Sequence, residues 1–167
     1  YYIGVFGYLN STFTLTAQMQ NPNRTTLLVE GQPQTGSLNG FHYAQYHFIL
    51  TEPKRQLFIA VSRREGDPDI YMTDDGSTPT TSHYTWKASF IGEDTLTVFN
   101  PRPADYRIAV FAYQVRARYT IVASTGSSSI ILAESVPFSG AVRSGDYAYF
   151  KFAIDRFDRD FTVVVTT

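Results

Sequence analysis

One stretch of the chain returns 104 residues later with its apolar, glycine and proline positions preserved. The matched positions are Leu28, Glu30, Pro33, Gly36, Leu38, Tyr43, Tyr46, Phe48, Leu50, Leu57, Ile59 and Val61, which correspond to Leu132, Glu134, Pro137, Gly140, Val142, Tyr147, Phe150, Phe152, Ile154, Phe161, Val163 and Val165. A period near 105 residues has the length of one small domain and is far longer than a solenoid repeat.

The start of the chain repeats its middle in the same way. The segment YYIGVFGY (1–8) returns as YRIAVFAY (106–113), and FTLTA (13–17) returns as YTIVA (119–123). The offsets here are 105 and 106 residues, so the two comparisons agree on one period.

The repeat predicts the domain organisation. We expect the closing hairpin of a preceding copy at 1–18, a complete domain at 27–124, and the first half of a following copy at 131–167. The polar stretches 18–26 and 124–129 occupy equivalent positions and are expected to be short linkers.

Neither partial copy contains an equivalent of residues 63–105. We therefore expect that the two fragments cannot complete one domain together, and that the chain belongs to a longer polypeptide. The alternative is that neighbouring copies complete each other by adding strands.

Alternating apolar and polar residues predict β-strands along nearly the whole chain, and no helical stripe is present. The alternating segments are 13–17, 46–50, 57–61, 70–72, 86–90, 96–98, 108–112, 119–123, 150–154 and 161–165. Turn-forming residues separate them, as at Asn21-Pro22-Asn23 and Gly66-Asp67-Pro68. Short strands at this spacing predict an all-β, antiparallel β-sandwich.

Composition excludes several classes of function. The net charge is −1, with acidic and basic residues interspersed, so no basic surface for nucleic acid is expected. No apolar run is long enough for a membrane span. The chain has no cysteine, which excludes disulfides, thiolate catalysis and cysteine-ligated metals.

Two Asn-x-Ser/Thr sequons, at Asn10 and Asn23, fall in expected turns where a glycan could be attached. They favour a secreted glycoprotein, although such short motifs also arise by chance.

The order of motifs resembles the bacterial pre-peptidase C-terminal domain family. The motifs are Glu30-x-x-Pro33-x-x-Gly36, the paired-strand segment 43–62, the acidic hairpin GDPDIYMT (66–73), the loop Glu93-Asp94, and the closing DYRIAVFAY with RYTIVAS. The resemblance implies a jelly-roll-like sandwich appended to secreted proteins, related to the collagen-binding domains of bacterial collagenases. The sequence departs from the family at Ala104-Asp105, where Pro-Gly often stands before the closing tyrosine.

No catalytic motif is recognised. The histidines His42, His47 and His83 lack metal-ligand spacing, and no Gly-x-Ser-x-Gly is present. Ser82 and His83 are adjacent and would point to opposite faces of a strand. The chain is expected not to be an enzyme and to need no cofactor.

Calcium is the one cofactor to weigh, because loop carboxylates are the ligands that it prefers and because some relatives of the family bind it. The candidate ligands are Asp67, Asp69, Asp74, Asp75 and Glu93, with Asp94 beside them. Ordinary turn chemistry is the competing interpretation, and we favour it.

Two groups of side chains are candidates for a binding surface. Tyr43 and Tyr84, with Tyr71 and His83, could form an aromatic platform, while most other tyrosines and phenylalanines are needed in the core. Arg116 and Arg118 alternate on the outward side of a hairpin, where they serve either as a solvated strand edge or as a contact between domains.

These observations predict a non-enzymatic, extracellular structural or interaction protein of the cell surface or matrix. Its tandem sandwiches would form a filament through domain–domain contacts and self-association, with other copies, a glycan or a fibrous protein as partners. The main alternative is an accessory glycan- or collagen-binding array of a secreted hydrolase, and a dedicated carbohydrate-binding module is a second. Neither nucleic acid nor membrane insertion is expected.

Overall fold

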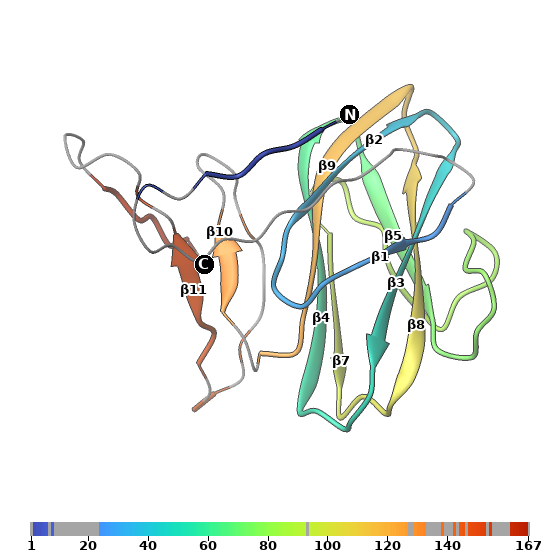
Figure 1. Ribbon diagram of the computed structural model, residues 1–167. Helices are drawn as coiled ribbons and strands as arrows, with labels where there is room; N and C mark the ends of the chain where they lie inside the picture. Colours follow the sequence, from blue (N-terminus) through green and yellow to red (C-terminus); the bar gives the residue numbers. More distant parts are fainter. Residues whose placement is uncertain are drawn as a thin grey trace.

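The molecule is described by a computed structural model. It covers residues 2–6, 8, 24–92, 94–126, 129–132, 138, 142, 144–145, 147–152, 154 and 161–166. Two facing β-sheets make up most of this part of the chain, and a smaller strand pair lies beside them (Figure 1).

The strands follow the alternation of the sequence. They are β1 (Thr26–Leu27), β2 (Gln34–Asn39), β3 (Tyr43–Leu50), β4 (Gln56–Glu65), β5 (Pro68–Thr73), β6 (Trp86–Ala88), β7 (Asp94–Phe99), β8 (Ala104–Ala112), β9 (Arg116–Ser124), β10 (Ile130–Leu132) and β11 (Phe150–Phe152). The all-β sandwich predicted from the sequence is confirmed by β1 to β9, which we call the sandwich.

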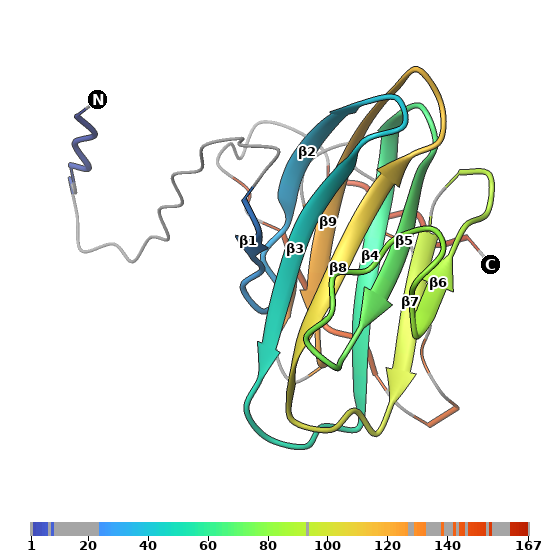
Figure 2. The ribbon, with the colours of Figure 1, turned by 90° about the vertical axis from the view of Figure 1, so that its right-hand side faces the viewer.

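The two sheets have the orders β1-β3-β8-β5-β6 and β2-β9-β4-β7. All neighbours are antiparallel except β1 and β3, which run parallel. Figure 2 shows the two sheets stacked face to face, with β5, β6 and β7 gathered on one side. The core lies between the sheets, where alternate residues such as Phe48, Ile59 and Ile108 are buried.

A buried pair of tyrosine hydroxyls crosses this core. The hydroxyl oxygens of Tyr46 and Tyr119 lie 2.9 Å apart, and each side chain is almost fully buried. Burial raises the pKa of both tyrosines, so each stays protonated and the pair satisfies its own hydrogen bond.

The small sheet reproduces a pairing of the sandwich 104 residues further along the chain. The register is Thr26–Tyr46 and Leu27–His47 between β1 and β3, and Ile130–Phe150, Ile131–Lys151 and Leu132–Phe152 between β10 and β11. Both pairs are parallel, so the sequence repeat is accompanied by the same local structure in its second half.

Two expectations from the alternation were wrong in detail. The strand expected at 86–90 ends at Ala88, and Phe90 is 76% exposed in a loop. His83, expected on a strand, lies in the connection between β5 and β6, held by a short bridge to Thr80. None of the described segments forms a helix that could cross a membrane.

Candidate functional site

The outer face of the four-stranded sheet is covered at one place by two residues from the later copy of the sequence repeat. Ala60 of β4 and Val122 of β9 face outward, and they form a buried cluster with Ile130 and Phe138. Ile130 is only 5% exposed. An outer face with polar side chains would remain solvated, so these apolar residues mark a contact surface, which we call the junction.

The junction continues into the loop that follows β1. The backbone N–H of Ile131 donates to the Gly31 carbonyl over 3.0 Å, and that of Gly31 donates to the Ala123 carbonyl over 2.8 Å. Glu30 adds a side-chain contact, because its Oε1 accepts from the Thr125 N–H (2.7 Å) and hydroxyl (2.9 Å). The start of the 124–129 stretch and β10 are therefore both fastened to the loop that follows β1.

An aromatic cluster occupies the outer face of the five-stranded sheet. The rings of Tyr43 and Phe111 lie 4.7 Å apart, and those of Tyr71 and Tyr84 lie 5.6 Å apart. Tyr71 and Phe111 are buried against Ala109, whereas Tyr84 is exposed. The cluster is extended by two exposed rings, Phe41 and Tyr113, which contact Phe111.

The predicted binding residues are thus divided between two surfaces. Tyr43 and Tyr84 both belong to the aromatic cluster, while Arg116 and Arg118 lie on β9 in the other sheet. The two arginines flank Glu65, with Arg118 Nε 3.3 Å and Arg116 Nε 4.0 Å from its carboxylate. Exposed ion pairs of this kind contribute little stability.

The sequence did not reveal what holds Tyr43. Its hydroxyl donates to the Thr81 hydroxyl (3.0 Å) and accepts from the Thr81 N–H (3.1 Å). These bonds tie the β5–β6 connection to β3, which lies 38 residues earlier, and no local pattern signals such a contact.

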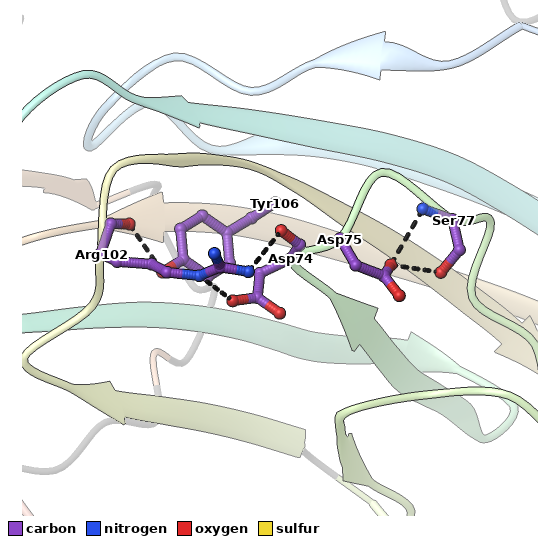
Figure 3. Close-up of polar contacts among 5 residues, drawn as sticks. All are labelled: Asp74, Asp75, Ser77, Arg102 and Tyr106. Atoms are coloured by element: carbon purple, nitrogen blue, oxygen red, sulfur yellow. Dashed lines mark hydrogen bonds and ion pairs between the residues drawn. The ribbon is translucent and has the colours of Figure 1, made fainter.

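Asp74 and Asp75 are engaged in turns and loops (Figure 3). Asp74 accepts from Arg102 Nε over 2.7 Å, and its carbonyl accepts from the same guanidinium. Asp75 accepts from the N–H and the hydroxyl of Ser77, and these bonds lower the pKa of Asp75. Asp75 therefore makes a local turn contact, whereas Asp74 joins the end of β5 to the loop before β8.

Asp67, Asp69 and Asp94 are buried near one another where β5 and β7 begin. Burial raises the pKa of Asp69 and raises the pKa of Asp94 to about 6, and repulsion among the three carboxylates adds to both shifts. Asp67 accepts from the Gly92 N–H and Asp94 from the Phe90 N–H, but Asp94 Oδ2 has no hydrogen-bond partner.

Nowhere in the described ranges do three or more His, Asp or Glu side chains form a group with the geometry to hold an ion. The candidate ligand Glu93 and the sequon residues Asn10 and Asn23 lie outside the described residues.

A serine–histidine contact is present that no sequence motif predicted. Ser77 Oγ lies 2.8 Å from His83 Nε2 and also contacts Asp75 Oδ1. In a catalytic triad the carboxylate accepts a hydrogen bond from the histidine, whereas here the carboxylate of Asp75 accepts one from the serine. The other histidines bond a carboxylate or a carbonyl: His47 Nδ1 lies 3.1 Å from Asp105, and His42 Nδ1 lies 2.8 Å from the Gly40 oxygen.

Comparison of the sequence with protein-family models and with curated proteins finds no match. Solved structures do match. The pre-peptidase C-terminal domain of a collagenase from Bacillus anthracis is similar, with a TM-score of 0.51 and 17% identity, covering 63% of this chain and 99% of that domain.

Two further structures match with lower scores. A periplasmic inhibitor of g-type lysozyme from Aeromonas hydrophila has a TM-score of 0.43 and 12% identity, covering 60% of this chain and 96% of its own. CorA, a surface-associated copper-binding protein of Methylomicrobium album BG8, has a TM-score of 0.45 and 8% identity, covering 60% and 97%. On the evidence of the collagenase domain, the sandwich has the fold of a pre-peptidase C-terminal domain, as the order of the sequence motifs indicated.

Proposed function

We propose that the chain is a non-catalytic extracellular structural or interaction protein in which successive β-sandwiches pack against one another. The observation that carries this proposal is the junction, where Ile130 and Phe138 of the second repeat cover Ala60 and Val122 of the sandwich. The fold supports a non-catalytic role, because the similar solved structure is the pre-peptidase C-terminal domain of a collagenase.

The contacts at the junction favour a fixed angle between consecutive sandwiches over a flexible connection. Buried apolar contacts are combined there with the backbone bond from Ile131 to Gly31 and with the Glu30–Thr125 contact. Each restricts the angle between one sandwich and the next. A surface or matrix filament is the assembly that such a rigid array would serve.

Val122→Asp tests the junction. The charge would lie on the outer face, so the core should stay folded while Ile130 and Phe138 lose their contact. We expect amide hydrogen exchange at Ile130 and Ile131, whose N–H groups are hydrogen-bonded, to accelerate at least about tenfold, because a contact worth about 1.4 kcal/mol changes local opening by that factor.

Ser37→Asp is the matched control, because it places the same charge on the outer face of the same sheet at β2, opposite Arg118 and four residues along β9 from Val122. Its exchange at Ile130 and Ile131 should equal that of the unaltered chain. Unchanged exchange in both Val122→Asp and Ile130→Asp would overturn the proposal.

A second candidate function is docking on a glycan or a collagen-like polymer, as an accessory array of a secreted hydrolase. The aromatic cluster favours it, because Tyr84, Phe41 and Tyr113 present exposed rings on one sheet face. Exposed aromatic surface of this kind suits stacking on sugar rings.

Tyr84→Ala and Tyr43→Ala should each weaken binding to such a polymer at least about tenfold, if the cluster is the docking surface. A glycan array together with a triple-helical collagen peptide supplies the measurement. Phe99→Ala, which removes an exposed ring from the other sheet, is the control. Absence of binding by the unaltered chain on both probes would exclude this function.

A further inference from the structure

The connections between the strands lie at two ends of the sandwich. Successive strands from β2 to β9 run in alternating directions, so the connections after β2, β4, β6 and β8 share one end. Figure 2 shows the turns after β2, β4 and β8 together at the top of the sandwich, and we call this end the upper end. The connections after β3, β5 and β7 lie at the opposite end.

Large apolar side chains are exposed to solvent at the upper end. We call them the apolar tips: Phe41 after β2, Phe90 and Ile91 after β6, and Tyr113 and Val115 after β8, with exposed fractions of 70%, 76%, 92%, 63% and 87%. Fractions this high leave few protein atoms beside each side chain, so the tips protrude separately and do not pack into a flat patch. Apolar side chains gathered in this way mark an interaction site.

The opposite end of the sandwich is different. Its connections are residues 51–55, 74–85 and 100–103, all of them described. Within these connections, Tyr84 is the one large apolar side chain that is exposed. Charged side chains pair there instead, as in the contact between Arg102 and Asp74. The apolar tips are therefore a property of the upper end and not of the turns in general.

Backbone hydrogen bonds fasten the turns after β2 and β8 to each other. The N–H of Gly40 donates to the Val115 carbonyl over 2.7 Å, and the N–H of Phe41 donates to the Ala112 carbonyl over 2.8 Å. A Cβ at Gly40 would overlap the Gln114 carbonyl, so glycine permits this close approach. Phe41 has φ +61°, a left-handed conformation that is costly for a bulky residue. The hydrogen bonds hold this strained residue where its ring is exposed.

Buried aspartates hold the loop after β6. Asp67 Oδ1 accepts from the Gly92 N–H, and Asp94 Oδ1 accepts from the Phe90 N–H, each over 3.0 Å. The Asp67 carbonyl also accepts from the Tyr113 N–H over 3.2 Å. One buried residue therefore connects the turn after β8 with the loop after β6, and the apolar tips are held on fixed backbone.

Exposed arginines lie beside the apolar tips. They are Arg63 and Arg64 near the end of β4 and Arg116 and Arg118 at the start of β9. Glu65 is exposed among them, with its carboxylate 3.3 Å from Arg118 Nε, and the loop after β6 contains Glu93, which lies outside the described residues. Four positive charges against these two negative ones leave a surplus of two at the surface of the upper end.

We propose that the upper end of the sandwich docks on an anionic lipid bilayer, with the apolar tips in the interfacial region and the arginines against phosphate head groups. Aromatic and aliphatic side chains partition into this region, and nearby basic residues add attraction to anionic lipid. A fluid bilayer closes around separate protruding side chains, whereas a protein partner needs a continuous complementary surface. The expectation against membrane insertion rested on the lack of a spanning segment, and this contact needs none.

Cysteine labelling gives the direct test, because the chain has no cysteine of its own. Ile91→Cys and Val115→Cys, each carrying a polarity-sensitive bimane dye, should shift their emission to the blue on phosphatidylcholine vesicles in which about one lipid in three is phosphatidylglycerol. Ile49→Cys is the control, because it is exposed on β3 near the opposite end, and its emission should not move. No shift at either tip, or an equal shift at the control, would overturn the proposal.

Vesicle co-sedimentation measures the apolar contribution. Ile91→Ser should weaken binding to the same vesicles at least about tenfold, because full burial of such a side chain is worth that factor or more. Ile49→Ser removes the same side chain near the opposite end and should bind as the unaltered chain does. Both positions are exposed, so both variants should keep the unfolding midpoint. Equal losses of binding would contradict docking through the tips.

The arginines are tested with a matched pair of double variants. Arg63→Gln with Arg64→Gln should weaken binding at least about tenfold, because each basic residue near an anionic surface contributes about a fivefold gain. Lys54→Gln with Arg55→Gln removes two charges at the opposite end and should leave binding nearly unchanged, because salt screens distant charges. Binding to pure phosphatidylcholine as tight as to anionic vesicles would overturn the anionic bilayer as the occupant. Absence of any vesicle binding by the unaltered chain would overturn the proposal and favour a protein partner.

Discussion

Gly66→Ala is expected to cost about 3–5 kcal/mol of folding free energy, because a strained backbone and an unavoidable clash act together. Gly66 has φ +73° at the turn where the chain crosses from β4 to β5, that is, from one sheet to the other. A Cβ there would overlap the Arg116 backbone carbonyl, which belongs to a paired strand and cannot turn aside. Urea unfolding followed by circular dichroism supplies the measurement.

Gly76→Ala separates the two causes. Gly76 has a similar φ of +83°, yet nothing lies within 4 Å of the position that its Cβ would take. Its cost should be about 1–2 kcal/mol, the penalty of the left-handed conformation alone. Equal losses in the two variants would show that the contact with Arg116 contributes nothing.

Asp94→Asn is expected to stabilise the protein by about 3 kcal/mol at pH 8 and by almost nothing at pH 4. Burial raises the pKa of Asp94 from 3.8 to about 6, so the folded state holds a proton that the unfolded state releases. The stability that this proton provides is complete below pH 3.8 and is lost as the pH rises through 6. Asparagine keeps the oxygen that accepts from the Phe90 N–H and carries no charge. The variant should therefore not lose this stability as the pH rises.

Unfolding free energies of both proteins from pH 4 to pH 8 give the difference directly. A difference that does not grow with pH would contradict a buried ionised carboxyl at this position. Added calcium at pH 7.5 tests the same position, and unfolding midpoints that do not move would speak against a cation bound there. A calcium-dependent gain that Asp94→Asn abolishes would instead identify a cation as the partner of Asp94 Oδ2.

The sandwich was predictable because its signal is periodic. Alternate residues of β4 and β8, such as Ile59 and Ile108, have to be buried together, and the alternation shows this without a structure. The parallel pairing of β1 carries no such signal, because two residues are too few for a period. The strand order was also hidden, because nothing in the repeat shows that β5, β6 and β7 are neighbours.

The candidate sites were predictable only in part. Tyr43 and Tyr84 were identified as candidates for a binding surface, and both lie in the aromatic cluster. Contacts made by irregular segments were missed: Ser77 reaches His83 within a long connection, and Thr81 reaches Tyr43 across the sheet. The junction was missed because Ala60 and Val122 have the character of core residues in sequence, yet they face outward.

The contact between Gly31 and Ala123 has a mechanical consequence. The chain enters the sandwich at β1 and leaves it after β9, and these points are joined by that hydrogen bond and by the one from Thr125 to Glu30. Tension applied through the flanking chain would pass along this short path, while most of the other strands carry no load. The first contact to break under force would therefore be the one at Glu30, which would lengthen the chain before any core residue became exposed.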